Sequence, residues 1–514
     1  MLNFVLSLLL LGCSVQCATL LRGGTFITYS ESTSNLEIVD NGAMLFNDTI
    51  IAISKTIDGL DSHSSDSNVK TVNTTGKIIS PGFIDTHRHT WQTAMRTLAP
   101  NIQLESYSWQ YGKTGPAALI YTPEDTYIST LMGNLEGLNA GVTTSLDFAH
   151  GMFSRAHAEA GLQGTIDSGA RAWWSYGVGP VVINGDPYTV NASASIDQLA
   201  HIRELASKNP FNDGLVNLGI AADPPTTEMV ETAQNLSINL ITAHDVGGPY
   251  LTGDNVIGLV NDLTPGSPTL NSSIAFVFAH VDFLNPSGAR LLREFNQYAS
   301  ITPESEMHYG LGHEASYLVL SVSIQDQAAL GVDTHFTFSI DIIGQMRIWL
   351  QATRERLYQE TLDRFKIPAS TPMSVRQAFL MGTRNGGLAL KRPDLGVLRE
   401  GAKADVVVFS TDAIGLIGWT DPIAAVVLHS NVGDIEDVYV DGQLVKQGGK
   451  LVVDWVEKGY AERLRASGLR FREELAKVNI TAFETGFKAL SGLTNEDFAD
   501  PFQVDVTRGD STGF

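Results

Sequence analysis

The sequence has few cysteines and fewer basic than acidic side chains. Its only cysteines, Cys13 and Cys17, lie in the first 17 residues, so the rest of the 514-residue chain has no thiol for a disulfide or a metal. Lys and Arg number 34 against 56 Asp and Glu, and the net charge of −22 disfavours binding to nucleic acid or to anionic membrane surfaces. We therefore expect a fold held by its core. The alternative interpretation of the acidic charge is that it serves solubility alone.

Long apolar runs are also scarce, and the N-terminal one, residues 4–11, is too short to span a bilayer. Small and polar residues follow it, and the pattern predicts residues 1–18 as a secretory signal peptide. A buried N-terminal strand or helix is the alternative, since no Lys or Arg precedes the run. Six glycosylation sequons fit a secreted glycoprotein: Asn47, Asn73, Asn191, Asn235, Asn271 and Asn479.

Residues 79–394 alternate short apolar runs with longer stretches of helical periodicity. Continuous apolar runs are typical of strands buried on both faces, and their alternation with helices indicates parallel βαβ units. Eight such units predict a (β/α)₈ barrel of the TIM type, with an open doubly wound sheet as the alternative. The runs are residues 78–85, 143–148, 170–178, 216–222, 238–243, 274–279, 299–302 and 328–332.

Both ends of the chain are rich in short strand-like segments. Residues 19–78 include a β-rich stretch with an expected turn at Gly23-Gly24, and a hairpin pattern about Asn47-Asp48. Residues 395–450 include a second hairpin pattern at Asp441-Gly442. We expect the two ends to pair into a small composite β-sandwich beside the barrel. An amphipathic helix and a loop-rich tail are expected in residues 451–514.

Ligand-type residues close several of the predicted barrel strands. His87 and His89 end the first, and residues two apart on a strand share a face, so both point to the barrel axis. His244, His280 and Asp333 close the fifth, sixth and eighth runs. A lone histidine at a strand end is more often a packed core residue. Four such strand ends on the carboxyl face, where barrel enzymes keep their reactive groups, predict a metal centre.

Imidazole and carboxylate ligands suit Zn²⁺, with Fe²⁺ or Mn²⁺ as alternatives. The absence of cysteine ligands favours a catalytic over a structural site. A divalent metal can lower the pKa of a coordinated water to about 7. Asp333 can then act as the general base, and His280 can orient the nucleophile or polarise the substrate.

Residues 81–89 (PGFIDTHRH) resemble the first-strand signature of the amidohydrolase superfamily. Residues 401–406 (GAKADV) and 440–442 (VDG) resemble its C-terminal sandwich, and residues 331–333 (GVD) its eighth-strand end. Residues 303–305 (PES) are similar to its cytosine-deaminase-like and triazine-hydrolase-like branch. The resemblance covers nearly the whole chain and implies a hydrolase of a non-peptide C–N bond in a small cyclic molecule. It implies the metal ligands His87, His89, His244 and Asp333, with His280 as a catalytic residue beside them.

The sequence departs from the family pattern at two points. Dinuclear members carry a carboxylated lysine at the end of the fourth strand, whereas this strand ends at Asp223 without a lysine, which favours one metal. Ring deaminases of the branch carry His-x-x-Glu on the fifth strand, and the Glu moves a proton to the ring nitrogen. Here Gly247 stands at the Glu position. Glu304 or Glu306 can supply that proton instead, with solvated loop acids as the alternative interpretation.

Side chains in the loops beyond the strand ends are candidates for substrate contacts, with packing as the alternative: Gln92, Trp109, His150 and His335. The aromatic-rich first loop suggests a flat or cyclic substrate. The same metal can also serve C–C, C–O or C–halogen chemistry, of the decarboxylase or lactonase type. A binding protein that holds a metal without turnover is the non-enzymatic alternative. An apolar barrel exterior also allows a homodimer.

Overall fold

The computed structural model describes residues 18–64, 66–250, 273–312, 323–501 and 504. The predicted signal peptide, residues 1–18, lies outside the described residues except for Ala18, the first residue of β1, and the sequon at Asn271 also lies outside them, so secretion stays a prediction. Among the described residues, no helix combines the length and the apolar character needed to cross a bilayer.

Eight parallel strands form a closed barrel. They are β6 (Phe83–His89), β7 (Val142–Ala149), β8 (Arg171–Val178), β11 (Val216–Ala222), β12 (Leu240–Val246), β13 (Ala275–Asp282), β14 (Tyr298–Ile301), and an eighth strand in two pieces, β15 (Ala328–Leu330) and β16 (Asp333–Thr334). β15 pairs with β14 and β16 pairs with β6, so the interrupted eighth strand closes the ring. The predicted TIM-type barrel is confirmed, and the open doubly wound alternative is wrong.

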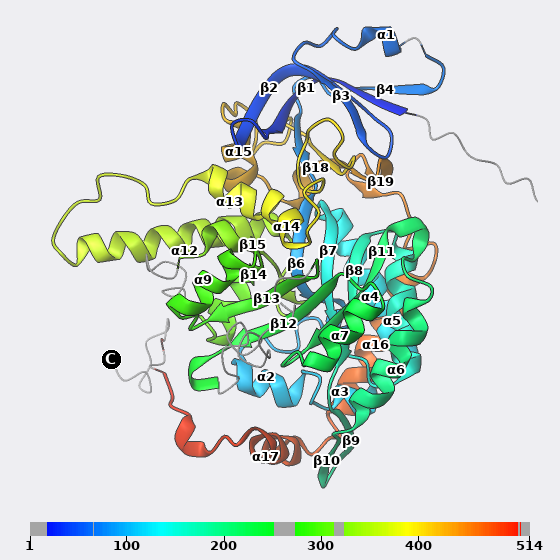
Figure 1. The fold of residues 1–514 in the computed structure, drawn as a ribbon, viewed down its shortest axis with the longest axis vertical. Coiled ribbons are helices and arrows are strands. Elements are labelled where there is room, and N and C mark those ends of the chain that lie inside the picture. Colours follow the sequence, from blue (N-terminus) through cyan, green and yellow to red (C-terminus); the bar gives the residue numbers. More distant parts are fainter. Residues whose placement is uncertain (1–17, 65, 251–272, 313–322, 502–503, 505–514) are drawn as a thin grey trace, which may run out of the picture.

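Helices surround the strands, and capping residues set where several of them begin (Figure 1). α4 (Pro123–Asn139) starts with proline in its first turn after a capping box between Thr122 and Asp125. In three further helices the N-cap side chain accepts a hydrogen bond from a backbone N–H group of the first turn. These are Ser154 before α5 (Arg155–Ser168), Thr226 before α7 (Thr227–Asn235) and Asn285 before α9 (Pro286–Glu294). Further helices are α6 (Ala194–Ala206), α10 (Pro303–Tyr309), α12 (Ile342–Leu362), α13 (Val375–Met381) and α14 (Arg384–Ala389).

The two ends of the chain build one mixed sheet of nine strands. Its order is β20-β19-β18-β17-β5-β1-β2-β3, with β4 beside β1. β5 pairs antiparallel with β17, which confirms that the two ends pair. The N-terminal strands are β1 (Ala18–Ser30), β2 (Asn35–Phe46), β3 (Ile50–Ser54), β4 (Val69–Asn73) and β5 (Ile78–Pro81); the C-terminal ones are β17 (Val406–Phe409), β18 (Ile435–Val440), β19 (Gln443–Gln447) and β20 (Lys450–Leu451).

Two local expectations were wrong. The predicted run 78–85 divides at Gly82 into β5 of the mixed sheet and β6 of the barrel. At Gly82 the chain passes so close to Thr143 that a Cβ atom would collide with it. Gly23-Gly24 does not form a turn. It is a bulge inside the continuous strand β1, with Gly23 in the left-handed region at φ +90°. The predicted hairpin at Asp441-Gly442 is confirmed, with positive φ at both residues.

The mixed sheet lies at one end of the barrel and two helices lie at the other (Figure 1). These are α2 (Leu104–Gln110) and α17 (Ile480–Ser491), which pack on each other. The predicted C-terminal helix is present as α16 (Tyr460–Leu475), and it packs on α4. No separate sequence pattern predicted α17, which lies close to the carboxyl ends of the barrel strands.

Candidate metal centre and its cavity

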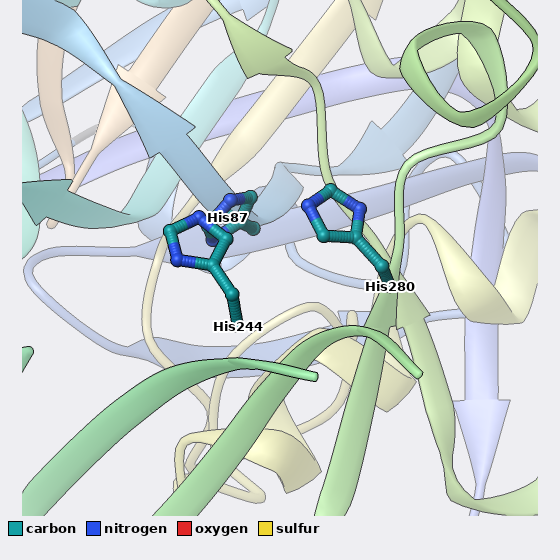
Figure 2. Close-up of side chains that lie close together, drawn as sticks. All are labelled: His87, His244 and His280. Atoms are coloured by element: carbon teal, nitrogen blue, oxygen red, sulfur yellow. The ribbon is translucent and has the colours of Figure 1, made fainter. Parts of the chain in front are cut away.

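Four histidines and one aspartate meet on the barrel axis. The potential ligand atoms of His87, His89 and Asp333 all lie within 4.8 Å of one another, and so do those of His87, His244 and His280. Figure 2 shows the rings of His87 and His244 side by side, with the ring of His280 facing them from the neighbouring strand. The structure therefore brings together all the metal-binding residues that the sequence predicted.

The backbone of β6 fixes the two histidines of the first strand. Arg88 turns away from the axis, and its Nε donates to Asp85 Oδ2 at 2.8 Å. Asp85 Oδ1 accepts from the backbone N–H groups of His87 and Val332, each at 3.2 Å, and so ties the first strand to the eighth. Burial raises the pKa of Asp85 to about 6 despite its contact with Arg88. This pair holds His87 and His89 in position without reaching the axis itself.

Asp333 faces both histidines of β6. Its Oδ1 lies 3.0 Å from His89 Nε2 and 3.4 Å from His87 Nε2, and Ser305 Oγ donates to its Oδ2. Burial would raise the pKa of Asp333, but the contacts with these histidines hold it well below its usual range. A fully ionised carboxylate among imidazoles is the form in which aspartate binds a divalent metal.

His244 is oriented by a carboxylate behind it. Its Nδ1 lies 3.0 Å from Asp223 Oδ2, and its backbone N–H donates to Asp223 Oδ1 at 2.8 Å. Lys113 Nζ lies 3.3 Å from Asp223 Oδ2 on the other side. Although burial opposes it, these cationic and donor partners hold the pKa of Asp223 well below its usual range. A proton on Nδ1 leaves His244 Nε2, 3.4 Å from His89 Nε2, as the metal-facing nitrogen.

The donor set fits a divalent metal ion. Both ring nitrogens of His87 are buried; Nδ1 has no hydrogen-bond partner among the described residues, and Nε2 has only the contact with Asp333 Oδ1 at 3.4 Å. Burial also lowers the pKa of His87 well below its usual value, so the imidazole is neutral. His89 Nδ1 lies 2.9 Å from the carbonyl oxygen of Phe148, which leaves its Nε2 for the axis. Unpartnered buried imidazoles of this kind are costly unless a metal uses them.

His280 lies beside this set in a strained backbone conformation, with φ at +72°. Its Nδ1 lies 2.9 Å from Thr302 Oγ1 and 3.6 Å from Glu306 Oε1. The rings of His280 and His244 stack with centroids 5.6 Å apart. The position suits a residue that orients a nucleophile or polarises a substrate.

A cavity of about 500 Å³ opens above the metal ligands. Four of its lining residues belong to the axial cluster: His89, His244, His280 and Asp333. Its walls come from α2 and the following loop, from the segment after β12, and from the end of α17. They are mainly apolar or aromatic, and include Leu104, Tyr107, Val246, Tyr250, Phe487 and Leu493.

Of the four predicted substrate contacts, the structure brings one to the cavity. His150 lines it and accepts a hydrogen bond from Trp91 Nε1 at 3.0 Å. Gln92 is buried and donates to Tyr107 Oη at 2.7 Å. Trp109 is 4% exposed and packs in a separate cluster with Val182 and Phe483. His335 is buried beside α4 and is not among the lining residues.

The two predicted proton donors also lie outside the lining of the cavity. Glu304 faces α12, where it accepts from Gln345 Nε2 at 3.0 Å. Glu306 is fully buried and accepts from the backbone N–H of Thr302 at 2.8 Å. Among the residues at the barrel axis, Glu306 contacts His280. It therefore positions the His280 ring rather than touching a substrate.

Sequence reasoning missed several residues of the cavity: Glu105, Tyr107, Lys113, Asp223 and Phe487. Asp223 had a usable signal, because it follows the fourth barrel strand directly. The others lie on α2, on its following loop and on α17, which have no strand-end signal.

Replacement of Asp223 by Asn is expected to weaken metal binding by about 10- to 100-fold, the usual effect of removing a partner of a ligating histidine. The amide keeps the shape but loses the charge that orients His244 Nδ1–H. The measurement is competition for zinc against a chromophoric chelator. Unchanged zinc affinity in the folded variant would contradict this role.

The Amidohydrolase family model matches residues 78–445. A 5-methylthioadenosine/S-adenosylhomocysteine deaminase of Thermococcus kodakarensis is 24% identical over 420 residues, which is 80% of this chain and 91% of that protein.

Solved structures with the same fold include two zinc proteins. An adenosine deaminase from Xanthomonas campestris with bound zinc superposes with a TM-score of 0.71 at 17% identity, over 90% of this chain and 99% of that one. An atrazine chlorohydrolase from Arthrobacter aurescens complexed with zinc gives 0.67 at 19% identity, over 88% of this chain and all of that one.

Proposed function

Because the chain belongs to the amidohydrolase family, we propose that this metal-dependent hydrolase uses a single zinc ion to release ammonia from an amino-substituted nitrogen ring of nucleoside size. The observation that carries the proposal is the axial cluster of His87, His89, His244 and Asp333 at the floor of the cavity. Zinc is favoured over iron or manganese by the zinc in the similar structures of an adenosine deaminase and a chlorohydrolase.

A single metal is supported by the end of the fourth strand. β11 ends at Ala222 and is followed by Asp223, which binds His244 Nδ1 and Lys113 and does not stand at the axis as a bridging ligand. The described residues thus offer one compact donor set. When bound, the metal supplies Lewis-acid activation of water.

The nucleoside-sized substrate is supported by the cavity. A volume of about 500 Å³ lies within the usual range for small-molecule sites, and its aromatic walls suit a flat ring. Tyr107 and Tyr250 can pack on the ring, and Phe487 and Leu493 of the C-terminal segment offer apolar contact to a substituent. The names of similar proteins, such as 5'-deoxyadenosine deaminase of Methanosarcina mazei, agree with an aminopurine bearing an apolar 5' end.

Asp333 and His280 have separate roles in the proposed reaction. Asp333 is ionised and takes a proton from the attacking water. His280, held through Nδ1 by Thr302, orients the water or hydrogen-bonds the developing oxyanion. The carbon–nitrogen bond then breaks, and the stored proton leaves with the amine as ammonia.

A second candidate is displacement of a halide or an alkoxide from the same type of ring carbon. Gly247 favours it, because the proton-moving Glu of ring deaminases is missing there. The similar fold of the atrazine chlorohydrolase agrees with it. Lactone opening, decarboxylation and non-catalytic metal holding have no comparable support in the cavity.

We expect the zinc-loaded protein to release ammonia from at least one aminopurine nucleoside with a kcat/KM of about 10⁴ M⁻¹s⁻¹ or more. The panel is adenosine, 5'-deoxyadenosine and 5'-methylthioadenosine, each beside its 6-chloro and 6-methoxy analogue. Ammonia, chloride and the ring product are measured together, with chelator-treated protein as the control. Turnover of only the chloro or methoxy compounds would favour the second candidate, and no turnover of any compound would overturn the proposal.

A further inference from the structure

Three acidic residues line the cavity among the described residues: Glu105, Asp223 and Asp333. Asp333 faces His87 and His89 on the axis, and Asp223 is held between His244 and Lys113. Both are therefore committed to the metal centre. Glu105 has no such partner.

Glu105 lies on α2 with its carboxyl group turned inward. Its Oε2 is buried and has no hydrogen-bond partner among the described residues. No ion pair involving Glu105 is found there either, and burial alone raises its pKa to about 7. A part-buried carboxyl group with one buried, unpartnered oxygen on the wall of a cavity is costly for stability, which indicates a group kept for a ligand.

Glu105 lines the cavity together with residues at the end of β12 and just after it. Leu104 and Tyr107, on either side of it along α2, pack on a cluster that includes Val246. Tyr250 packs on the same cluster, and its pKa is raised by burial and by the charge of Glu105. Glu105 therefore lies beside the segment that contains Gly247, where ring deaminases of this branch carry their proton-moving Glu.

We propose that Glu105, supplied by α2 rather than by the fifth strand, is the catalytic acid that protonates the ring nitrogen of the substrate. This inference rests on the proposed function and adds a residue to it. It also explains how the chain can act on an aminopurine although Gly247 has no side chain. Glu304 and Glu306, the sequence-based candidates, are bound elsewhere.

The deamination balances in protons when Glu105 is the acid. As water adds its oxygen to the amino-bearing carbon and gives one proton to Asp333, the electron pair of the C=N bond moves to the ring nitrogen. That nitrogen takes the proton of the Glu105 carboxyl group. The C–NH₂ bond then breaks, and the amine leaves as ammonia with the proton held by Asp333. The new hydroxyl returns its proton to Glu105 as the C=O bond forms, so both carboxyl groups end as they began.

The test is Glu105→Gln, which keeps the shape of the side chain and removes the transferable proton. We expect kcat for ammonia release to fall by about 10²- to 10⁴-fold, the usual range for a general acid, with KM changed much less. Zinc content and the unfolding midpoint should match those of the wild type. Glu304→Gln is the matched control, because Glu304 is also a part-buried acid with a raised pKa but lies away from the cavity; its kcat should stay within about two-fold.

A second variant distinguishes the loss of the proton donor from a structural effect of the substitution. Glu105→Ala leaves room for formate, and added formate should restore part of the lost kcat in the zinc-loaded protein. A folded, zinc-loaded Glu105→Gln with wild-type kcat, or a Glu105→Ala that formate does not rescue, overturns the inference. If the wild type itself acts on none of the panel compounds, the proposed function fails as well, and the two failures are distinguished by the wild-type assay alone.

Discussion

Replacement of His87 by Ala is expected to abolish zinc binding and to lower kcat/KM by at least about 10³-fold. Metal activation contributes several kcal/mol to the transition state, and each 1.4 kcal/mol is a factor of ten in rate. His87 is fully buried and is the ligand that both three-residue groups of the cluster share. Its removal therefore opens the centre of the donor set, which the remaining residues cannot close without moving their strands.

The measurement is turnover together with zinc content after gel filtration. His201→Ala is a matched control, because His201 is equally well buried but lies on α6 against Tyr176, away from the cavity. Its turnover and zinc content should stay within about two-fold of the wild type. Full turnover in zinc-free His87→Ala would contradict the assignment of the axial cluster as the catalytic centre.

Replacement of Asp405 by Ala is expected to lower the free energy of unfolding by about 3 kcal/mol, because it removes the carboxylate of a buried ion pair, although Arg171 keeps its second pair with Asp441 at 2.8 Å. Asp405 is 2% exposed and binds the guanidinium group of Arg171 on β8. Its other oxygen accepts from the backbone N–H of Asp441 at 2.8 Å, in the β18–β19 turn. Asp405 thus fastens the mixed sheet to the barrel.

For a chain of this length, such a loss lowers the unfolding midpoint by roughly 3–5 °C, as followed by circular dichroism or calorimetry. Asp197→Ala is the control, since Asp197 also pairs with an arginine, Arg155, but is 65% exposed. Exposed pairs contribute little to stability, and no measurable shift is expected there. Equal midpoints for the two variants would show that the buried pair does not fasten the sheet.

The barrel could be predicted because its strands are continuous apolar runs that end in polar residues. The same feature exposed the metal site, since His87 and His89 sit two apart and Asp333 closes the last run. These signals are local. The prediction was wrong where a local pattern allowed two interpretations. Gly23-Gly24 has the composition of a turn but forms a bulge, because the pairing of β1 with β2 continues on both sides of it.

Apart from His150, the walls of the cavity could not be predicted from the sequence. Trp109 and Phe487 both belong to short helices, yet Phe487 lines the cavity and Trp109 packs outside its lining. Which side chain of α2 points inward depends on how α2 and α17 lie over the barrel, a tertiary contact between residues nearly 400 apart in the sequence. Glu105 was missed for the same reason.

Stoichiometric addition of zinc to the chelator-stripped protein distinguishes one catalytic metal per chain from two or none. Ammonia release is expected to rise linearly with added zinc and to reach its plateau at one equivalent per chain, while stripped His87→Ala gains nothing. A plateau at two equivalents would contradict the single-metal centre. Turnover that does not depend on zinc or on any other divalent ion would contradict the metal-dependent hydrolase itself.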